Sequence, residues 1–310
     1  MPDLRRGVLF GIAAYIMWGL FPLYWPLLKP SGAVEILAHR MVWSLVTVLV
    51  VLAIRRHWAW IKEIVRQPRK LGLLAVAALF VTVNWGVYIY AVNSNQIVEG
   101  SLGYFINPLV NVLFGVVLLR ERLRPLQWVA VGFGALAVLV LTFDYGRLPW
   151  VALTLALSFG IYGLVKKRAG VAGTESLAVE NLIMLLPALG YLGFLQVGGE
   201  ATFGQEGSGH VLLMVGTGLL TAVPLICFGA AAISVPLSTI GLLQYIAPIL
   251  QFACGVLVAG EVMPSSRWIG FSIVWLALAV FTYDSLRAAR KTRTARRMQA
   301  RLLQPERSTT

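Results

Sequence analysis

Ser101-Leu102-Gly103-Tyr104-Phe105-Ile106-Asn107-Pro108 occurs a second time, in altered form, as Gly241-Leu242-Leu243-Gln244-Tyr245-Ile246-Ala247-Pro248. The two prolines are 140 positions apart, and the same offset holds outward from them without a gap. It pairs residues of several chemical types, namely Gly115 with Gly255, Glu121 with Glu261, Trp128 with Trp268, and Asp144 with Asp284. Apolar letters match by chance in any apolar chain, whereas these residue types matching in one register predict an internal repeat.

The composition places this repeat in a membrane. The 310 residues are 58% hydrophobic and 13% charged, whereas a soluble protein has about 25% charged residues. A membrane span needs roughly 20 apolar residues, and runs of this kind predict ten spans near 8–28, 34–54, 71–92, 100–119, 127–144, 149–166, 176–197, 210–232, 238–259 and 267–286. We therefore predict an all-α membrane protein, whose first run is a permanent helix rather than a cleaved signal peptide.

The net charge of +13 would suggest nucleic acid in a soluble protein, but in a membrane protein it indicates orientation. With the N-terminus in the cytoplasm, 22 of the 26 Lys and Arg residues fall in cytoplasmic segments. Only Lys29, Arg147 and Arg267 fall outside, and Arg40 lies within a helix. The charge pattern thus predicts cytoplasmic N- and C-termini, a lipid bilayer around the chain and no nucleic-acid partner.

Each half of the repeat contains five predicted helices. Because five is odd, the second copy must enter the membrane from the opposite face, which makes two inverted five-helix repeats. The expected units are residues 1–144, residues 145–286 and a basic cytoplasmic tail at 287–310. Inverted repeats are typical of secondary transporters, whose substrate site lies near the bilayer midplane between the halves. The pattern therefore predicts a small-molecule substrate.

Polar and aromatic side chains inside the apolar runs are the candidates for a substrate cavity, because buried polar groups are costly in hydrocarbon. Tyr104, Asn107 and Asn111 share one helix face, and the repeat carries two of these positions to Gln244 and Gln251. The full candidate set is Tyr15, Trp18, Asn84, Trp85, Tyr88, Tyr104, Asn107, Asn111, Gln244, Tyr245 and Gln251. Alternatively, the amides only join helices to one another.

The aromatic residues have a second interpretation as well. Trp25, Trp58, Trp60 and Trp150 lie near helix ends, where an interfacial belt or ordinary packing is the favoured interpretation. Trp18 and Trp85 lie deeper in their predicted helices and are better candidates for the cavity.

His39 and Arg40, about two turns into the second predicted helix, are the sharpest single signal. One interpretation is an anion or proton-coupling site, and the other is an arginine that pairs with Glu35 or Glu99 near the outer surface. The 140-residue offset makes Glu180 the counterpart of Arg40, and it is a further candidate for proton coupling. The two lie towards opposite membrane faces, so no direct bridge between them is expected.

Four carboxylates at helix ends are interpreted as structural, since such groups commonly pair with an arginine or with a helix N-terminus; they are Glu121, Glu261, Asp144 and Asp284. The sequence holds no P-loop, no zinc-binding His-Glu-x-x-His, no Cys-x-x-Cys and no Gly-x-Ser-x-Gly. We therefore expect neither a cofactor nor an enzyme, and we interpret Cys227 and Cys254 as packing residues.

Several motifs together resemble one family. They are Ile36-Leu37-Ala38-His39-Arg40 with Trp43-Ser44, Asn84-Trp85, Ala91-Val92-Asn93, the stretch ending at Pro108, and Gln244-Tyr245-Ile246-Ala247-Pro248. In combination they resemble the RarD family, in the EamA-type branch of the drug/metabolite transporter superfamily. One departure is Arg120-Glu121, where the second copy has Gly260-Glu261, typical of such helices.

The resemblance implies a permease of the bacterial inner membrane, with ten helices around a central cavity. It implies transport of a small organic metabolite or drug by alternating access, while proton coupling stays open. The alternative is a membrane sensor or partner subunit that transports nothing.

Overall fold

The computed structural model describes residues 4–56, 58–120 and 122–302, and in these ranges it consists of helices without strands. The elements of the first half are α1 (Leu4–Gly19), η1 (Phe21–Leu23), η2 (Trp25–Leu28), α2 (Ala33–Ile54), α3 (Ala59–Val65), α4 (Pro68–Asn93), α5 (Ile97–Leu119) and α6 (Pro125–Tyr145). Those of the second half are α7 (Trp150–Ala169), α8 (Gly173–Gly198), α9 (Gly207–Ser234), α10 (Leu237–Leu243), α11 (Ile246–Ala253), η3 (Cys254–Val258) and α12 (Ser265–Leu302).

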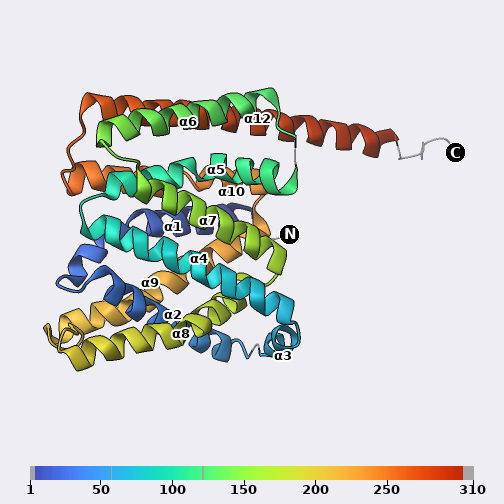
Figure 1. The fold of residues 1–310 in the computed structure, drawn as a ribbon. Helices are drawn as coiled ribbons and strands as arrows, with labels where there is room; N and C mark the ends of the chain where they lie inside the picture. The colour runs from blue at the N-terminus through green and yellow to red at the C-terminus, as the bar shows by residue number, and fades with distance from the viewer. Residues whose placement is uncertain (1–3, 57, 121, 303–310) are drawn as a thin grey trace.

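Ten segments of the described chain are long and apolar enough to cross a membrane, which confirms the predicted all-α membrane fold. The first helix begins, and the last helix ends, at the same end of the bundle (Figure 1). The last helix runs on well past its neighbours at that end. An even number of crossings requires this placement of the two chain ends.

Proline changes two of the predicted spans. The first run was expected to be one helix over 8–28, but α1 stops at Gly19 and two 3₁₀ turns follow, each with a proline, Pro22 or Pro26, in its first turn. The ninth span breaks after Leu243, at Gln244, whose carbonyl lies four residues before Pro248 and would clash with the proline ring in a continuous helix. Its counterpart Pro108 lies inside the continuous helix α5, so the two copies respond differently to the same residue.

Several helix contacts occur in pairs that the predicted repeat relates to one another. Helix α4 packs on α7, and the equivalent helices α9 and α1 pack on each other. Likewise α5 packs on α7, and α11 packs on α1. Two further contacts, α2 with α8 and α6 with α12, join equivalent helices of the two halves. In Figure 1, α6 and α12 form one edge of the bundle, and α2, α8 and α9 lie at the opposite side.

Some of these contacts depend on glycine. A side-chain carbon added at Gly218 of α9 would lie 2.4 Å from the carbonyl oxygen of Trp43 in α2, and one added at Gly103 of α5 would lie 2.7 Å from that of Ala152 in α7. Small residues allow such close approach between helices in a membrane, where dispersion contacts rather than the hydrophobic effect hold helices together.

Helices α6 and α12 are joined by an ion pair at each end. Asp284 lies near the end of the membrane span of α12. It accepts a hydrogen bond from Nε of Arg124, the residue that immediately precedes α6, at 2.6 Å. Asp144 at the end of α6 accepts from Nε of Arg267, 2.9 Å away, at the start of α12, and also from the hydroxyl of Ser266. The predicted structural role of both aspartates is confirmed.

A charge swap tests whether these ion pairs stabilise the helix pair. Arg124→Asp is expected to lower the free energy of unfolding by about 1 kcal/mol, because Arg124 is partly exposed and solvent weakens its pair with Asp284. Arg124→Asp combined with Asp284→Arg should restore most of the loss in thermal unfolding measured in detergent. Equal stability of the single and double variants would contradict a pairwise contribution.

Candidate functional site

Arg40 is the centre of the candidate site. It lies on α2, its side chain is only 2% exposed, and its Nε donates a hydrogen bond to Oγ1 of Thr221 on α9 at 2.9 Å. The guanidinium carbon lies 3.9 Å from the ring centroid of Trp85, 5.2 Å from that of Trp25 and 5.5 Å from that of Phe21. Cation–π contacts of this kind partly replace the lost hydration of the charge.

No carboxylate of the described residues forms an ion pair with Arg40. Glu35 instead accepts a hydrogen bond from the backbone N–H of Thr202 at 2.8 Å. Glu99 pairs with Arg147 at 2.7 Å, and it also accepts from the N–H of Val151. The predicted alternative, in which Arg40 pairs with Glu35 or Glu99, is therefore wrong, because both carboxylates are already engaged.

Three hydrogen-bonding groups of this cluster have no partner among the described residues. They are Nη1 of Arg40, Nε1 of Trp25 and the hydroxyl of Tyr88. The ring of Tyr88 packs edge-on against Tyr104, with centroids 5.5 Å apart, and Tyr88 lies in the same buried cluster as Phe21 and Trp25. Unpaired polar atoms are costly when buried, so these three indicate a candidate ligand site. Among the described residues, Oδ1 of Asn107 and Oε1 of Gln251 are likewise buried without a partner.

Asn84 holds the neighbouring helices together. Its Nδ2 donates to the carbonyl of Leu155 and to the hydroxyl of Ser158, both at 3.0 Å and both on α7. Its Oδ1 accepts from the hydroxyl of Tyr104 on α5, also at 3.0 Å. Asn84 thus joins three helices, and it fixes the position of one of the rings near Arg40.

The other predicted cavity residues have partners other than Arg40, although Trp18 packs against the cluster that contains Phe21, Trp25 and Tyr88. Tyr15 and Trp18 of α1 pack against Phe228 of α9, and Gln251 donates from Nε2 to the carbonyl of Trp18 at 3.2 Å. The remaining members are Asn107, which is buried, Asn111, which is exposed, and Gln244 and Tyr245, which lie at the break between α10 and α11. Their assignment to a substrate cavity stays a prediction.

The two other charge candidates have different surroundings. His39 stacks on Phe203 of the α8–α9 loop, with ring centroids 4.5 Å apart. Glu180 on α8 is 1% exposed and forms an ion pair of 2.9 Å with Lys166 of α7. It also accepts from the hydroxyls of Ser176 and Tyr162. Glu180 is therefore a fully partnered charge, in contrast to Arg40.

Sequence reasoning missed three members of the cluster. Phe21 and Thr221 were not singled out, and Trp25 was assigned to an interfacial belt or to packing because it lies near the end of the first predicted helix. The turns η1 and η2 instead fold Trp25 inward, where it is fully buried against Arg40. The two prolines of these turns, Pro22 and Pro26, were the signal in the sequence that could have indicated this.

Glu261 confirms its predicted structural role. Its carboxylate accepts from the backbone N–H groups of Ile97 and Val98 at the start of α5, so it is bound to a helix N-terminus. Burial raises the pKa of the Glu261 carboxyl, although these two N–H groups and the nearby Arg267 oppose that shift. Its counterpart Glu121 lies outside the described residues.

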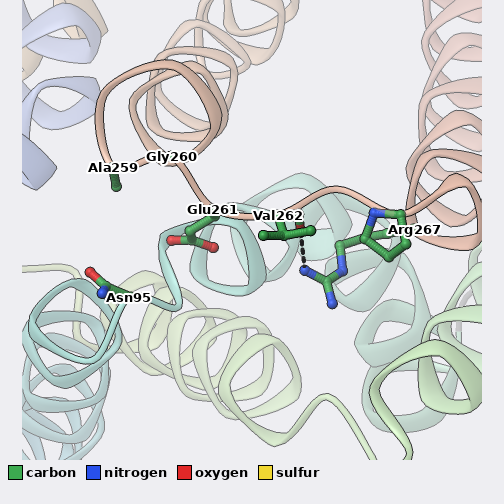
Figure 2. A pocket seen from close by; sticks show the side chains of 7 residues that line it. Asn95, Ala259, Gly260, Glu261, Val262 and Arg267 are labelled. Carbon is green, nitrogen blue, oxygen red and sulfur yellow. Dashed lines mark hydrogen bonds between the residues drawn. The ribbon is translucent and has the colours of Figure 1, made fainter.

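A hollow of about 400 Å³ lies beside Glu261 (Figure 2). It is lined by loop residues at one end of the bundle, namely Asn95, Ala259, Gly260, Glu261, Val262, Pro264 and Arg267. None of these residues belongs to the Arg40 cluster. The cluster itself is closed, with its side chains packed against one another.

Comparison with known proteins places the chain among transporters. A sequence model described as the EamA-like transporter family matches residues 5–143. Protein RarD of Streptomyces exfoliatus is 60% identical over 94% of this chain and 92% of its own. An uncharacterized transporter of Vibrio cholerae is 43% identical over 95% of this chain and 97% of its own, and protein RarD of Escherichia coli is 41% identical over 93% and 97%.

A solved crystal structure has a fold similar to that of this chain. It superposes with a TM-score of 0.60, covers 91% of this chain and 98% of its own, and shares 20% sequence identity. At that identity the likeness concerns the fold alone.

Proposed function

Since this chain belongs to the RarD group of the EamA-like transporter family, we propose that it is a secondary transporter that moves a small organic solute by alternating access. The protein is a multi-pass membrane protein. The proposed location is the inner membrane of a bacterium, with both chain ends in the cytoplasm. Support for that orientation comes from the shared end of α1 and α12 and from the basic residues near it.

The proposed mechanism needs two halves that can change their relative position. We assign these halves to residues 1–144 and 145–286, followed by the basic tail at 287–310. This division is supported by two equivalent contacts across the proposed halves, α4 with α7 and α9 with α1. Two such halves can open a shared site towards either face of the membrane in turn.

One observation carries the proposal beyond family membership. The buried Arg40 cluster lies where α2 of the first half meets α9 of the second, and the Arg40–Thr221 hydrogen bond links the two. A site between the halves is where alternating access requires the substrate. A charged residue within a membrane span is itself an indication of function.

Transport in liposomes tests the proposal. We expect saturable uptake of at least one solute from a panel of amino acids, organic acids, amphiphilic metabolites and chloramphenicol. Preloading the liposomes with the same unlabelled solute should accelerate uptake, because the loaded carrier then returns with cargo. Protein-free liposomes are the control.

Two results would contradict the proposal. The absence of flux for every solute, with or without a pH gradient, would argue against a transporter. Saturable binding of a solute without any flux would favour the alternative, a membrane sensor or partner subunit.

A further inference from the structure

We propose that the Arg40 cluster binds the carboxylate of an organic monoanion with an aromatic or flat apolar body. This inference rests on the proposed transport function, since it names the substrate class of that transporter. It is carried by the charge balance around Arg40, by the unpaired hydrogen-bonding groups and by the aromatic rings that enclose them.

The charge balance is the first step. Arg40 keeps its charge in a protein, and at 2% exposure the guanidinium has lost nearly all of its hydration. The described residues supply one hydrogen-bond acceptor, the hydroxyl oxygen of Thr221, and the faces of three rings, but no negative charge. Arginine at membrane depth is normally paired or faces water, whereas no carboxylate of the described residues pairs with Arg40.

The equivalent position of the second half shows what a completed site contains. The 140-residue offset places Glu180 opposite Arg40 in the repeat, and Glu180 is paired with Lys166 at 2.9 Å. The same offset takes Lys166 to Pro26, which stands beside Trp25. The second half therefore neutralises its buried charge with a neighbouring helix, whereas the first half offers aromatic rings and leaves the counter-ion to come from outside.

The unpaired groups define the chemistry of that counter-ion. Arg40 Nη1 and Trp25 Nε1 can only donate hydrogen bonds, and the hydroxyl of Tyr88 can donate as well. A carboxylate is an acceptor with two oxygens, so it can satisfy several of these donors together. One arginine without a second cation matches a single negative charge, which favours a carboxylate over a doubly charged phosphate.

The rings define the rest of the ligand. Phe21, Trp25 and Trp85 surround the guanidinium, and Tyr88 and Tyr104 complete the wall. Such a lining gives a large contact area with few hydrogen bonds, which suits an aromatic or flat apolar group rather than a sugar or a peptide. Because Thr221 belongs to the second half, opening its contact with Arg40 would admit the anion as the halves separate.

Binding to the purified full-length protein in detergent tests the inference. The probes are benzoate, 3-phenylpropionate and indole-3-acetate, each compared with its neutral amide, together with phenyl phosphate. We expect at least one acid to bind about 10-fold or more tightly than its amide, measured by calorimetry and by the rise in melting temperature. Arg40→Gln should weaken binding of the acid by about 30-fold and leave binding of the amide unchanged.

Three further variants separate ligand binding from a structural role. Arg40→Lys should retain the preference for the acid at reduced affinity, because it keeps the charge but loses the planar fork. Trp25→Phe keeps a ring and removes the Nε1 donor, so it should weaken acid binding about 3- to 10-fold. Arg147→Gln is the matched control, since Arg147 also lies near a ring but is already paired with Glu99, and it should leave the preference unchanged. If Arg40→Gln does not fold, the Lys and Phe variants still give the result.

Several outcomes would overturn the inference. These are equal binding of acids and amides, an unchanged preference in Arg40→Gln, tighter binding of phenyl phosphate than of the acids, and no binding of any acid. Each can occur while liposomes still transport a neutral or cationic solute, in which case the transport function stands and the substrate class is wrong. Arg40-dependent binding without flux would instead support the site and contradict transport.

Discussion

Glu180→Gln is expected to lower the free energy of unfolding by about 3 kcal/mol or more, because it removes one partner of a buried ion pair. The change would leave the ammonium group of Lys166, whose side chain is 19% exposed, without its carboxylate. Ser176 and Tyr162 would also lose a charged acceptor. Chemical or thermal unfolding in detergent, followed by circular dichroism, measures the loss.

The double variant Lys166→Met with Glu180→Gln is the control. Because it removes both charges, it should recover most of the stability that the single variant loses. If the double variant is as unstable as Glu180→Gln alone, the loss does not come from an uncompensated charge on Lys166. Glu180→Gln with unchanged stability would contradict it equally.

The same variants separate stability from proton coupling. Glu180 and His39 are both candidates for coupling, but the pairing of Glu180 with Lys166 supports a structural role for the carboxylate. If the double variant folds and still shows uptake driven by a pH gradient, Glu180 is not the coupling group.

Gly218→Ala is expected to have the second large effect, a loss of about 2–3 kcal/mol in the free energy of unfolding. The added carbon would lie 2.4 Å from the carbonyl oxygen of Trp43 and 2.6 Å from its carbonyl carbon, both of which are backbone atoms that cannot rotate away. The hydroxyl of Thr47, 2.7 Å away, is itself bound to that carbonyl oxygen. Helices α2 and α9 would therefore have to move apart.

Gly229→Ala, on the same helix, is the matched control. A carbon added there meets no atom within 4 Å, so the change should be neutral or slightly stabilising, since alanine favours helices over glycine. Thermal unfolding of both variants in the same detergent gives the comparison. Equal stability of the two would show that the α2–α9 contact tolerates wider spacing.

Moving α2 and α9 apart would also affect the candidate site. Arg40 and Thr221 lie on these two helices, so Gly218→Ala should lengthen or break the bond between them.

The number and order of the spans were predictable because apolar runs of about 20 residues have few alternatives in a membrane. The ends of these spans were less so. Pro26 lies within an apolar run that looks continuous in sequence, yet the helix ends at Gly19. Pro108 and Pro248 occupy equivalent positions, but only the second interrupts its helix. Whether a proline breaks a helix depends on neighbouring helices, which the local sequence does not contain.

The site was predictable in part. A charge within an apolar run identifies Arg40 without a structure, because burial in a membrane follows from the run itself. The partners of the charges were not predictable, since they join segments far apart in sequence. Lys166 was counted with the cytoplasmic charges, but it pairs with Glu180, and Glu99 is engaged by Arg147 rather than by Arg40.

The ion pairs at both ends of α6 and α12 have a mechanical consequence. One of these helices comes from each half, and together they form one edge of the bundle (Figure 1). These ion pairs favour α6 and α12 staying together, so if the proposed halves move as the transport mechanism requires, we expect the largest movement at the opposite side, where α2, α8 and α9 lie. The edge formed by α6 and α12 would then be the hinge about which the two proposed halves open.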